Sequence, residues 1–498
     1  MSTPLISPPR SSVRANHRWL ILAVLSIAQL MVVLDATIVN IALPEAQTAL
    51  DFSDGQRQWV ITAYSLAFGS LLLLGGRIND LFGRKNSFIV GLVGFAAASA
   101  LGGWGPSFEV LVTARALQGA FGALLAPAAL SLLTVTFAGS ADRGKAFGIF
   151  GAIAGAGGAI GLLMGGFLTE YLSWNWCLYV NVVFAVIALI GAIVLLPQHV
   201  KSDEPKPLDW IGTILVTVGL FLIVYGFANS ESNGWTDTLT IVPLVIGLAL
   251  LVAFSWVETK VAHPLLPMRI LLDRMRGTSY LVMLIAAIGM FSIFLFLTYY
   301  LQQTLGFSPV TTGLAFLPMV ASIAITAAVS GSVLVTRLSP KVMVAAGLTV
   351  SAAGMVFLTT ISTDSSYLTG VVPGLIMVGI GLGTVFANAM SLATYGVARH
   401  DAGIASATVN TAQQVGGSIG VALLSSFAAT AAENYASSHT PIGANGMQAI
   451  ADGASMASYH TAFWWAAGFF ALGALIAGAL YRNEIPQVDP DAEPVIAH

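Results

Sequence analysis

The stretch GGRINDLFGRKNSF, from Gly75 to Phe88, places four charged residues between two long apolar runs. Arg77, Asp80, Arg84 and Lys85 lie within it, and the apolar runs on either side contain no charged residue. Charged side chains are costly inside a bilayer, so a polar stretch between two apolar runs predicts a loop at a membrane surface. The same contrast recurs along the chain and decides the fold class.

The composition indicates an integral membrane protein. Of the 498 residues, 56% are hydrophobic and 9% are charged, and the mean hydropathy is +0.84. Soluble domains carry about 25% charged residues, so a soluble protein is excluded. The net charge of -3 gives no reason to expect a nucleic-acid partner. The single cysteine, Cys177, excludes an internal disulfide, and no Cys/His cluster has the spacing of a metal site.

Fourteen runs of roughly 18 to 25 mostly uncharged residues predict membrane-spanning helices. They form groups of six, two and six, separated by two charged loops. The first run is too long for the core of a signal peptide, so we expect it to be retained as a span. The runs are Trp19–Leu43, Trp59–Leu74, Ser87–Trp104, Val110–Phe137, Ala146–Leu168, Trp176–Leu196, Leu208–Ala228, Leu239–Trp256, Ser279–Gln302, Val310–Val335, Val342–Thr360, Tyr367–Leu392, Ile404–Ala428 and Thr461–Leu480.

The distribution of basic residues predicts the orientation. If the N-terminus is cytoplasmic, the loops on that side contain 18 of the 20 Lys and Arg residues. Arg57 alone lies outside, and Arg115 lies within a span. This excess follows the positive-inside rule, so we expect both termini and the Gly75–Lys85 loop to be cytoplasmic. The count does not test the middle pair of spans, which we predict from their length.

The charged loop has a particular spacing. Gly76, Asp80, Gly83, Arg84 and Lys85 follow the pattern G-x-x-x-D-x-x-G-R-K, which resembles the loop between the second and third spans of the major facilitator superfamily. The resemblance implies a conformational clasp, in which the acid pairs with basic groups and a helix end. Helix N-terminal amides favour a carboxylate, and helix C-terminal carbonyls or anionic lipids favour basic side chains. A plain positive-inside anchor remains the alternative.

Other segments resemble the fourteen-span drug:proton antiporter branch of that superfamily. They are LDATIVNIALP (Leu34 to Pro44), RALQGAFGA (Arg115 to Ala123), YLQQTLGFSPVTTGLAFLP (Tyr300 to Pro318) and NTAQQVGGSIG (Asn410 to Gly420). The resemblance covers essentially the whole chain. It implies an all-α integral membrane protein in which two six-helix bundles flank a two-helix insert and expose a central cavity alternately to each side.

The expected division of the chain follows from this architecture. The charged, proline-rich segment from Pro197 to Pro207 ends the first bundle. We expect a cytoplasmic tail at 1–18, an N-terminal six-helix bundle at 19–197, a linker with the two-helix insert at 198–257, a cytoplasmic loop with the C-terminal six-helix bundle at 258–481, and a cytoplasmic tail at 482–498.

The fifth span departs from the antiporter pattern. Leu162 stands where the family motif usually has a proline, so the helix keeps an intact amide there and we expect it to be straighter. Gly157, Gly161 and Gly165 lie four apart on one helix face, and Gly166 follows them. This spacing permits close packing against a partner helix, which is the simplest role for these glycines.

Two charges lie deep within predicted spans. Asp35 is the only acid well inside a span, and Arg115 is the only basic residue there. A central charge costs at least about 2.5 to 3.5 kcal/mol on insertion scales, so such residues usually face a protein interior and carry function. We expect Asp35 to bind the transported proton, and the resemblance implies that Arg115 modulates it. Mutual neutralisation without a further role is the alternative.

Polar and aromatic side chains within the spans are candidates for a substrate cavity. An adaptable aromatic wall with a few hydrogen-bonding groups suits a lipophilic molecule. Ties between helices and plain aromatic packing remain the alternatives for these residues. The candidates are Gln29, Asn40, Tyr64, Gln118, Asn181, Phe291, Tyr299, Asn388, Asn410 and Gln414.

Two other classes of protein are excluded. GSADRGKA, from Gly139 to Ala146, fits the pattern G-x-x-x-x-G-K of an ATP-binding loop, but Ala146 stands where such a loop has Ser or Thr. All seven histidines lie in tails, loops or at a span edge, so the spans lack the side chains of an intramembrane enzyme. We therefore expect neither catalysis nor a bound metal.

The sequence thus predicts a multi-pass protein of the bacterial inner membrane that exports lipophilic drugs or antibiotics. The proton gradient is the expected energy source, with no cofactor. The expected partners are the small-molecule substrate, protons and membrane lipid, with no nucleic acid and no obligate protein partner. A facilitator or proton-coupled transporter of a metabolite with the same fold is the alternative.

Overall fold

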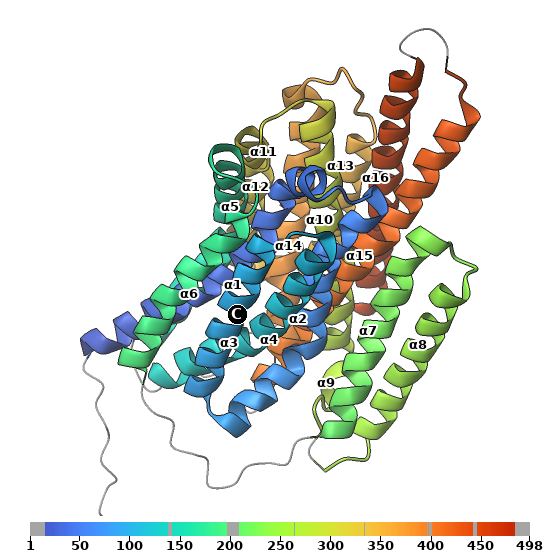
Figure 1. Cartoon of the computed structure of the whole chain (residues 1–498). Helices are drawn as coiled ribbons and strands as arrows, with labels where there is room; N and C mark the ends of the chain where they lie inside the picture. Colours follow the sequence, from blue (N-terminus) through green and yellow to red (C-terminus); the bar gives the residue numbers. More distant parts are fainter. Residues whose placement is uncertain are drawn as a thin grey trace, which may run out of the picture.

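The computed structural model describes residues 15–137, 142–196, 209–262, 264–332, 334–395, 397, 401–441 and 446–483. Within these residues the chain is helical and contains no β-strand (Figure 1). The helices follow the apolar runs, because a segment in lipid must satisfy its backbone hydrogen bonds internally. The prediction of an all-α membrane protein is confirmed.

The helices form three groups along the chain. The first group is α1 (Ala15–Leu50), α2 (Asp54–Phe82), α3 (Arg84–Trp104), α4 (Phe108–Thr136), α5 (Arg143–Tyr171) and α6 (Trp176–Leu195). The second is the pair α7 (Trp210–Asn233) and α8 (Thr238–Glu258). The third is α9 (Met268–Leu271), α10 (Arg274–Tyr299), α11 (Pro309–Ala315), α12 (Leu317–Ser332), α13 (Pro340–Leu358), α14 (Val372–Thr394), α15 (Ala402–Ser438) and α16 (Gly446–Leu480).

Short irregular turns extend some of these helices. A π-helical turn, Tyr300–Thr304, continues α10, and a second one, Tyr367–Val371, precedes α14. In the described part of the chain, 13 helical stretches are long and apolar enough to cross a membrane. The helix α5 has 29 residues and completes the first group of six. Fourteen crossings and the cytoplasmic location of both termini stay predictions.

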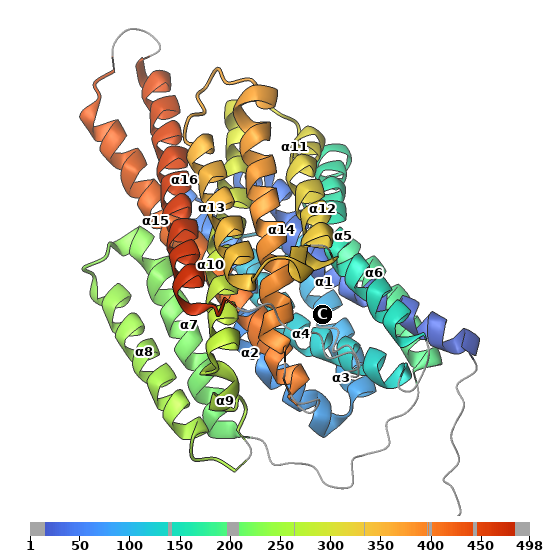
Figure 2. The same cartoon turned by 180° about the vertical axis from the view of Figure 1, so that it is seen from behind.

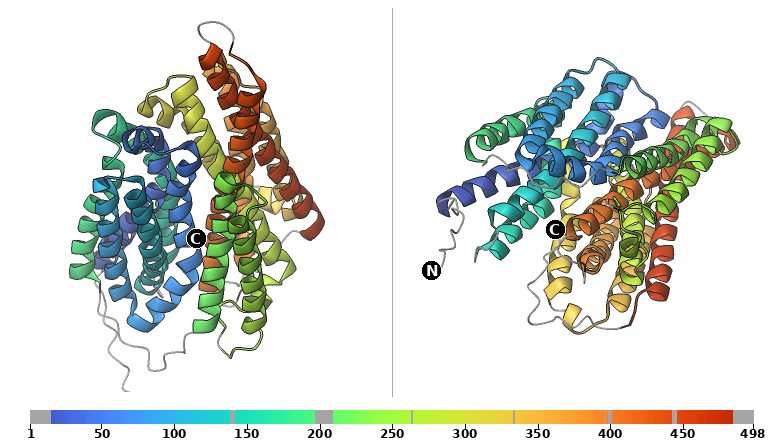
Figure 3. Two further views of the ribbon diagram at one scale, coloured as in Figure 1. Left: turned by 45° about the vertical axis from the view of Figure 1, so that its right-hand side comes forward. Right: turned by 90° about the horizontal axis from the view of Figure 1, so that it is seen from below.

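The pair α7 and α8 flanks the two larger groups (Figures 2 and 3). The helix α7 packs against α2 and α15, whereas α8 packs against α7. Gln58 of α2 donates a hydrogen bond to the Ala228 carbonyl of α7 at 3.1 Å, and Thr217 of α7 donates to the Ser70 carbonyl of α2 at 3.2 Å. The pair is therefore attached where the first and third groups meet.

The two larger groups are joined at their outer end, which is the end at which α1 stops and α2 begins. Tyr299 of α10 donates to the side chain of Gln47 in α1 at 2.5 Å. Glu170 of α5 accepts a hydrogen bond from the backbone N–H of Val310 in α11 at 3.0 Å. These contacts tie α10 and α11 to α1 and α5 on the side that the sequence predicts to face outward.

The helices α15 and α16 project beyond the other helices at the outer end (Figure 1). The sequence predicts a segment between spans at about 429–460, but α15 continues to Ser438 and α16 begins at Gly446. Alanine has the highest helix propensity, so this Ala-rich stretch is helical although it is not strongly apolar. Tyr435 packs against Gly453, where a Cβ atom would lie 2.3 Å from the tyrosine ring.

The helix α5 runs without interruption through Leu162, where the resembling motif has a proline. Its glycine face packs against α1. A Cβ atom at Gly161 would lie 2.0 Å from the Thr37 hydroxyl, and one at Gly165 would lie 2.7 Å from the Ile38 carbonyl oxygen. This face therefore packs closely against α1, and the contact fixes the part of α1 that follows Asp35.

Of the other two glycines of this motif, Gly157 also packs against α1, whereas Gly166 contacts α11. A Cβ atom at Gly157 would lie 2.9 Å from the Val33 side chain of α1. One at Gly166 would lie 2.5 Å from the Pro309 carbonyl oxygen of α11. Gly166 therefore lies at the contact between the first and third groups, next to the hydrogen bond of Glu170.

The contact between α2 and α4 depends on Gly75 rather than on its neighbour. A Cβ atom at Gly75 would lie 2.1 Å from the carbonyl oxygen of Ala123 in α4. A Cβ atom at Gly76 meets no atom within 4 Å. Successive residues of a helix point about 100° apart, so only one of two adjacent glycines can face the partner helix.

We expect Gly75→Ala to lower the melting temperature of the detergent-solubilised protein, because α2 and α4 must separate to admit the methyl group. Gly76→Ala is the matched control, since it gains about 1 kcal/mol of helix propensity and meets open space. Thermal unfolding followed by gel filtration measures both variants. Equal melting temperatures for the two would contradict the packing argument.

Candidate functional site

The two deep charges of the sequence form an ion pair. Asp35 of α1 and Arg115 of α4 are 0% and 2% exposed, and Arg115 Nη1 lies 2.6 Å from Asp35 Oδ2. A buried pair persists only where hydrogen bonds satisfy its remaining polar atoms. The neighbouring helices supply those hydrogen bonds.

Four further hydrogen bonds surround the pair. Gln118 Nε2 and Asn181 Nδ2 both donate to Asp35 Oδ1, at 2.9 and 2.6 Å. Arg115 donates through Nε to the Val60 carbonyl of α2 at 3.1 Å and through Nη1 to Gln118 Oε1 at 2.9 Å. The helices α1, α2, α4 and α6 therefore meet at one buried polar group, which we call the Asp35 cluster.

Two more side chains complete the Asp35 cluster. The guanidinium carbon of Arg115 lies 4.4 Å from the ring centroid of Tyr64, a cation–π arrangement. Tyr64 donates to the Val32 carbonyl of α1 at 3.3 Å. Ser99 of α3 is hydrogen-bonded by Gln118 Nε2 at 2.8 Å. Ser99 thus adds α3 to the helices that contribute to the Asp35 cluster.

The hydrogen bonds of Asp35 fit an ionised acid. Its oxygens meet Arg115, Gln118 and Asn181, each through an N–H donor, and an ionised carboxylate is an acceptor only. A proton on Asp35 would turn one oxygen into a donor and displace one of these groups. Arg115 would keep its hydrogen bonds to Val60 and Gln118. Arg115 therefore has hydrogen-bond partners whether Asp35 is ionised or neutral.

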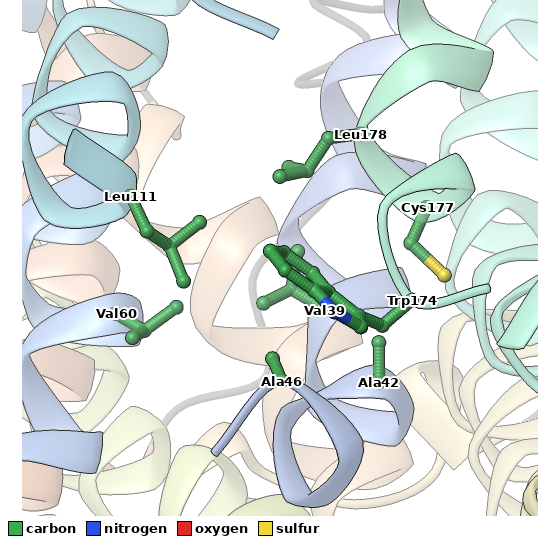
Figure 4. Close-up of a pocket in the computed structure, with 8 residues that line it drawn as sticks. All are labelled: Val39, Ala42, Ala46, Val60, Leu111, Trp174, Cys177 and Leu178. Carbon is green, nitrogen blue, oxygen red and sulfur yellow. The ribbon is translucent and has the colours of Figure 1, made fainter. Parts of the chain in front are cut away.

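An apolar layer lies outward of the Asp35 cluster, and Figure 4 shows the side chains of this layer. Val39 and Leu111 lie one helical turn outward of Asp35 and Arg115, and the buried Trp174 lines the same pocket as both. A small pocket in this layer is lined by Val39, Ala42, Ala46, Val60, Leu111, Trp174, Cys177 and Leu178. These side chains carry no charge, so the surroundings outward of the ion pair are apolar at this level.

The prediction of a loop at Gly75–Lys85 is wrong, because α2 continues to Phe82 and α3 begins at Arg84, so only Gly83 lies between the helices. The charged residues at these two helix ends contact the end of α6 and a connecting segment. Lys85 Nζ donates to two carbonyls at the C-terminal end of α6, at 3.2 and 2.6 Å. Arg77 Nη2 donates to the Pro264 carbonyl at 3.0 Å. Gly83 turns the chain between the two helices with a φ of 89°, which favours glycine. The inner ends of α2 and α3 therefore hold the segment before α9 and the end of α6, respectively.

The acidic half of the predicted clasp stays a prediction. The side chain of Asp80 lies outside the described residues, although its backbone belongs to the last turn of α2. Arg84 begins α3 and is half-buried. Gly76 faces open space. Of the five clasp residues, Lys85 and Gly83 have the clearest structural roles.

The remaining cavity candidates do not converge on one place. Asn388 of α14 donates to the Ser330 hydroxyl of α12 at 2.6 Å. Phe291 packs on Gly417, where a Cβ atom would lie 2.9 Å from its ring. Tyr299 belongs to the outer contact between α10 and α1. These three side chains join helices to one another.

Other candidates are held by their own helices or by a neighbour. Asn40 donates to the Ala36 carbonyl at 3.2 Å, and Asn410 donates to the Ser406 carbonyl at 3.1 Å. Gln414 of α15 faces Gly69 of α2, where a Cβ atom would lie 3.0 Å from the glutamine Cβ. Gln29 of α1 is half-buried. Tyr64, Gln118 and Asn181 are the candidates that the structure brings together.

The sequence gives no sign of several residues that complete the site. A backbone carbonyl such as that of Val60 leaves no trace in a hydropathy pattern. Ser99 is one small polar residue in an apolar run, where a serine carries little information. Gln302 lies in the antiporter-like segment of the sequence, and it donates to the Ile41 carbonyl at 3.0 Å outside the Asp35 cluster. The described residues contain no group of three His, Cys, Asp or Glu side chains that could hold a metal ion.

Comparison with known proteins gives the relatives of this chain. The family described as Major Facilitator Superfamily matches residues 25–421. The chain is similar to the puromycin resistance protein pur8 of Streptomyces alboniger, with 48% identity over 95% of this chain and 93% of that protein. It is also similar to the cephamycin export protein CmcT of Amycolatopsis lactamdurans, with 37% identity over 80% of this chain and 82% of that protein.

Solved structures share the fold. The crystal structure of an auto-inhibited POT family peptide transporter matches with a TM-score of 0.69 over 96% of this chain and 99% of that chain, at 16% identity. At this identity the likeness concerns the fold alone. The family match, the bacterial relatives and the membrane-spanning helices identify a multi-pass transporter of the bacterial cell membrane. The chain belongs to the Major Facilitator Superfamily.

Proposed function

We propose that this transporter exports a lipophilic antibiotic or drug in exchange for protons. The similarity to an antibiotic resistance protein and to an antibiotic export protein, each over at least 80% of this chain, supports the substrate class. The apolar composition of the spans suits a lipophilic substrate. The chain is expected to use no cofactor besides the proton gradient.

The observation that carries proton coupling is the hydrogen bonding of Asp35. This carboxylate is fully buried at membrane depth and meets three donors from two helices. Protonation would neutralise the acid and release at least one donor, so it would change how α1 holds α4 and α6. A proton on Asp35 is thereby linked to helix packing, as alternating access requires.

Arg115 has a positioning role in this proposal. Its hydrogen bonds to the Val60 carbonyl and to Gln118 keep the guanidinium in place when Asp35 is neutral. The arginine then stabilises the ionised acid again once the proton leaves. If the two groups only neutralise each other, removal of the acid's charge weakens the fold and leaves coupling unchanged.

A metabolite transporter of the same fold is the second candidate. Uptake into inside-out vesicles with an imposed pH gradient separates the two functions. An exporter concentrates substrate inside such vesicles while protons flow out, and a facilitator only equalises the concentrations. Puromycin is the first compound to test, because one relative is named for resistance to it.

We expect Asp35→Asn to abolish substrate accumulation driven by a pH gradient and to retain substrate binding. Asparagine has the shape of the acid but cannot exchange a proton at this position. Vesicle accumulation measures coupling, and binding to the purified protein measures affinity.

Glu109→Gln is the matched control for this variant. Glu109 lies on α4, as Arg115 does, but it is exposed near the outer end, and its loss should leave accumulation intact. Accumulation at the wild-type level by the Asp35 variant would place the proton site elsewhere.

We expect protection against neutral and singly charged lipophilic compounds to exceed protection against dications. A cation in a low-dielectric cavity needs an acid to offset its desolvation. Asp35 is already bonded to Arg115, Gln118 and Asn181.

A resistance assay in a host without its own pumps measures this preference. Mono- and dicationic compounds of similar size are compared in pairs. Stronger protection against the dications would mean that a further acid, such as Glu45 at the outer end of α1, faces the substrate.

A further inference from the structure

Two acids lie at the inner end of the pair α7 and α8, away from the Asp35 cluster. Asp209 precedes α7, and Glu258 is the last residue of α8. Their exposed fractions are 9% and 3%, so both carboxyl groups are shielded from water. Neither belongs to the transport mechanism proposed above.

Each acid uses one oxygen for a backbone hydrogen bond. Asp209 Oδ1 accepts from the Gly212 N–H at 2.8 Å and caps α7. Glu258 Oε2 accepts from the Leu266 N–H at 3.0 Å. The second oxygens, Asp209 Oδ2 and Glu258 Oε1, are buried and have no hydrogen-bond partner.

The two unpartnered oxygens point at the same place. A Cβ atom on Gly212 would lie 2.3 Å from Asp209 Oδ2 and 2.5 Å from Glu258 Oε1. The two oxygens therefore lie at most 4.8 Å apart, which is the sum of these two distances. The two side chains are close enough to hydrogen-bond as soon as one of them carries a proton. Gly212 leaves the room for this approach.

No cation in the described surroundings balances the two acids. On the segment after α8, Lys260 is exposed, and Arg77 of α2 bonds to the Pro264 carbonyl. On α9 and beside α15, Arg269 and Asp401 pair with each other. The first turn of α7 contains no acidic residue and no basic residue (residues 210–213).

We propose that Asp209 and Glu258 bind one proton between them, as a second protonation site of this transporter. Two ionised carboxylates this close repel each other, and one shared proton removes the repulsion. The proton is covalently held by one of the two facing oxygens and donated to the other. Asp209 Oδ2 and Glu258 Oε1 then form a hydrogen bond with each other. This site does not depend on the export proposal.

The shared proton fixes the segment that leads from α8 to the third group of helices. Glu258 holds Leu266, and Leu265 and Leu266 are buried against α7, α8 and Leu73 of α2. Arg77, near the inner end of α2, donates a hydrogen bond to the Pro264 carbonyl in the same segment. Loss of the proton at alkaline pH on the inner side therefore loosens the link between the helix pair, α2 and the third group.

The sign of the pH effect follows from proton binding. The folded pair retains a proton at pH values where the two separate acids of an unfolded chain are ionised. The folded protein thus binds more protons than the unfolded one. Its stability is then full at acidic pH and falls as the pH rises through the range in which the pair releases its proton.

The test uses the purified full-length protein in an Asp35→Asn background, so that the known deep acid gives no signal. Infrared spectra in D₂O detect a protonated carboxyl group, and thermal unfolding is measured from acidic to alkaline buffer. Glu258→Gln and Asp209→Asn each replace one acid by an amide, which donates to the remaining carboxylate as the shared proton does. Asp237→Asn is the matched control, since Asp237 caps the opposite end of α8 through Leu239.

We expect the protonated-carboxyl band to disappear in both the Glu258 and the Asp209 variant and to persist in the Asp237 variant. The fall in melting temperature with pH should shrink by more than half in the first two variants only. If one amide variant does not fold, the other gives the same comparison.

Three outcomes would overturn the proposal. They are an unchanged band in both variants, an unchanged pH dependence of melting, and stabilisation by Mg²⁺ or Ca²⁺ that both variants lose. The last outcome would mean that the two carboxylates hold a metal ion instead of a proton. Failed drug export by the wild type would leave this test unaffected, so the two proposals fail separately.

Discussion

A charged carboxylate at membrane depth constrains the whole N-terminal group of helices. Such a charge costs several kcal/mol unless donors surround it, and the donors around Asp35 come from α4 and α6, with α2 holding Arg115 through a carbonyl. These helices must therefore meet at one level. The glycine face of α5 lets that helix approach α1 directly beside the acid, at Thr37 and Ile38. Packing and electrostatics thus impose the same arrangement.

Hydropathy predicts the helices well, because lipid demands long apolar segments with internally paired backbones. It fails where a helix leaves the lipid. The outer ends of α15 and α16 are rich in alanine and polar residues, so their helicity comes from propensity and from packing such as that of Tyr435 on Gly453. The apolar part of a helix is therefore predictable from sequence, whereas the length of a helix beyond the membrane is not.

The sequence predicts the two charged residues of the site but not the neutral side chains that hydrogen-bond to them. A buried charge stands out in an apolar run, so Asp35 and Arg115 are evident from the sequence. Gln118 and Asn181 reach the same oxygen from different helices, and only the packing of α1 with α4 and α6 brings them together. Asn388 has the same chemistry as Asn181 and ties α14 to α12 instead. A polar residue within a span predicts a hydrogen bond, but only the packing of the helices determines which group it binds.

The apolar layer outside Asp35 also has an electrical consequence. Val39, Leu111 and Trp174 are apolar side chains in this layer. A membrane voltage falls mainly across apolar regions of low dielectric constant rather than across hydrated ones. Moving one elementary charge through the full potential changes the free energy by about 2.3 kcal/mol per 100 mV. If Asp35 binds the transported proton as we propose, a proton that arrives from the outer side crosses this layer and gains part of that energy. The voltage and the pH difference would then act on the same carboxylate, so a cell could drive the transporter with either one.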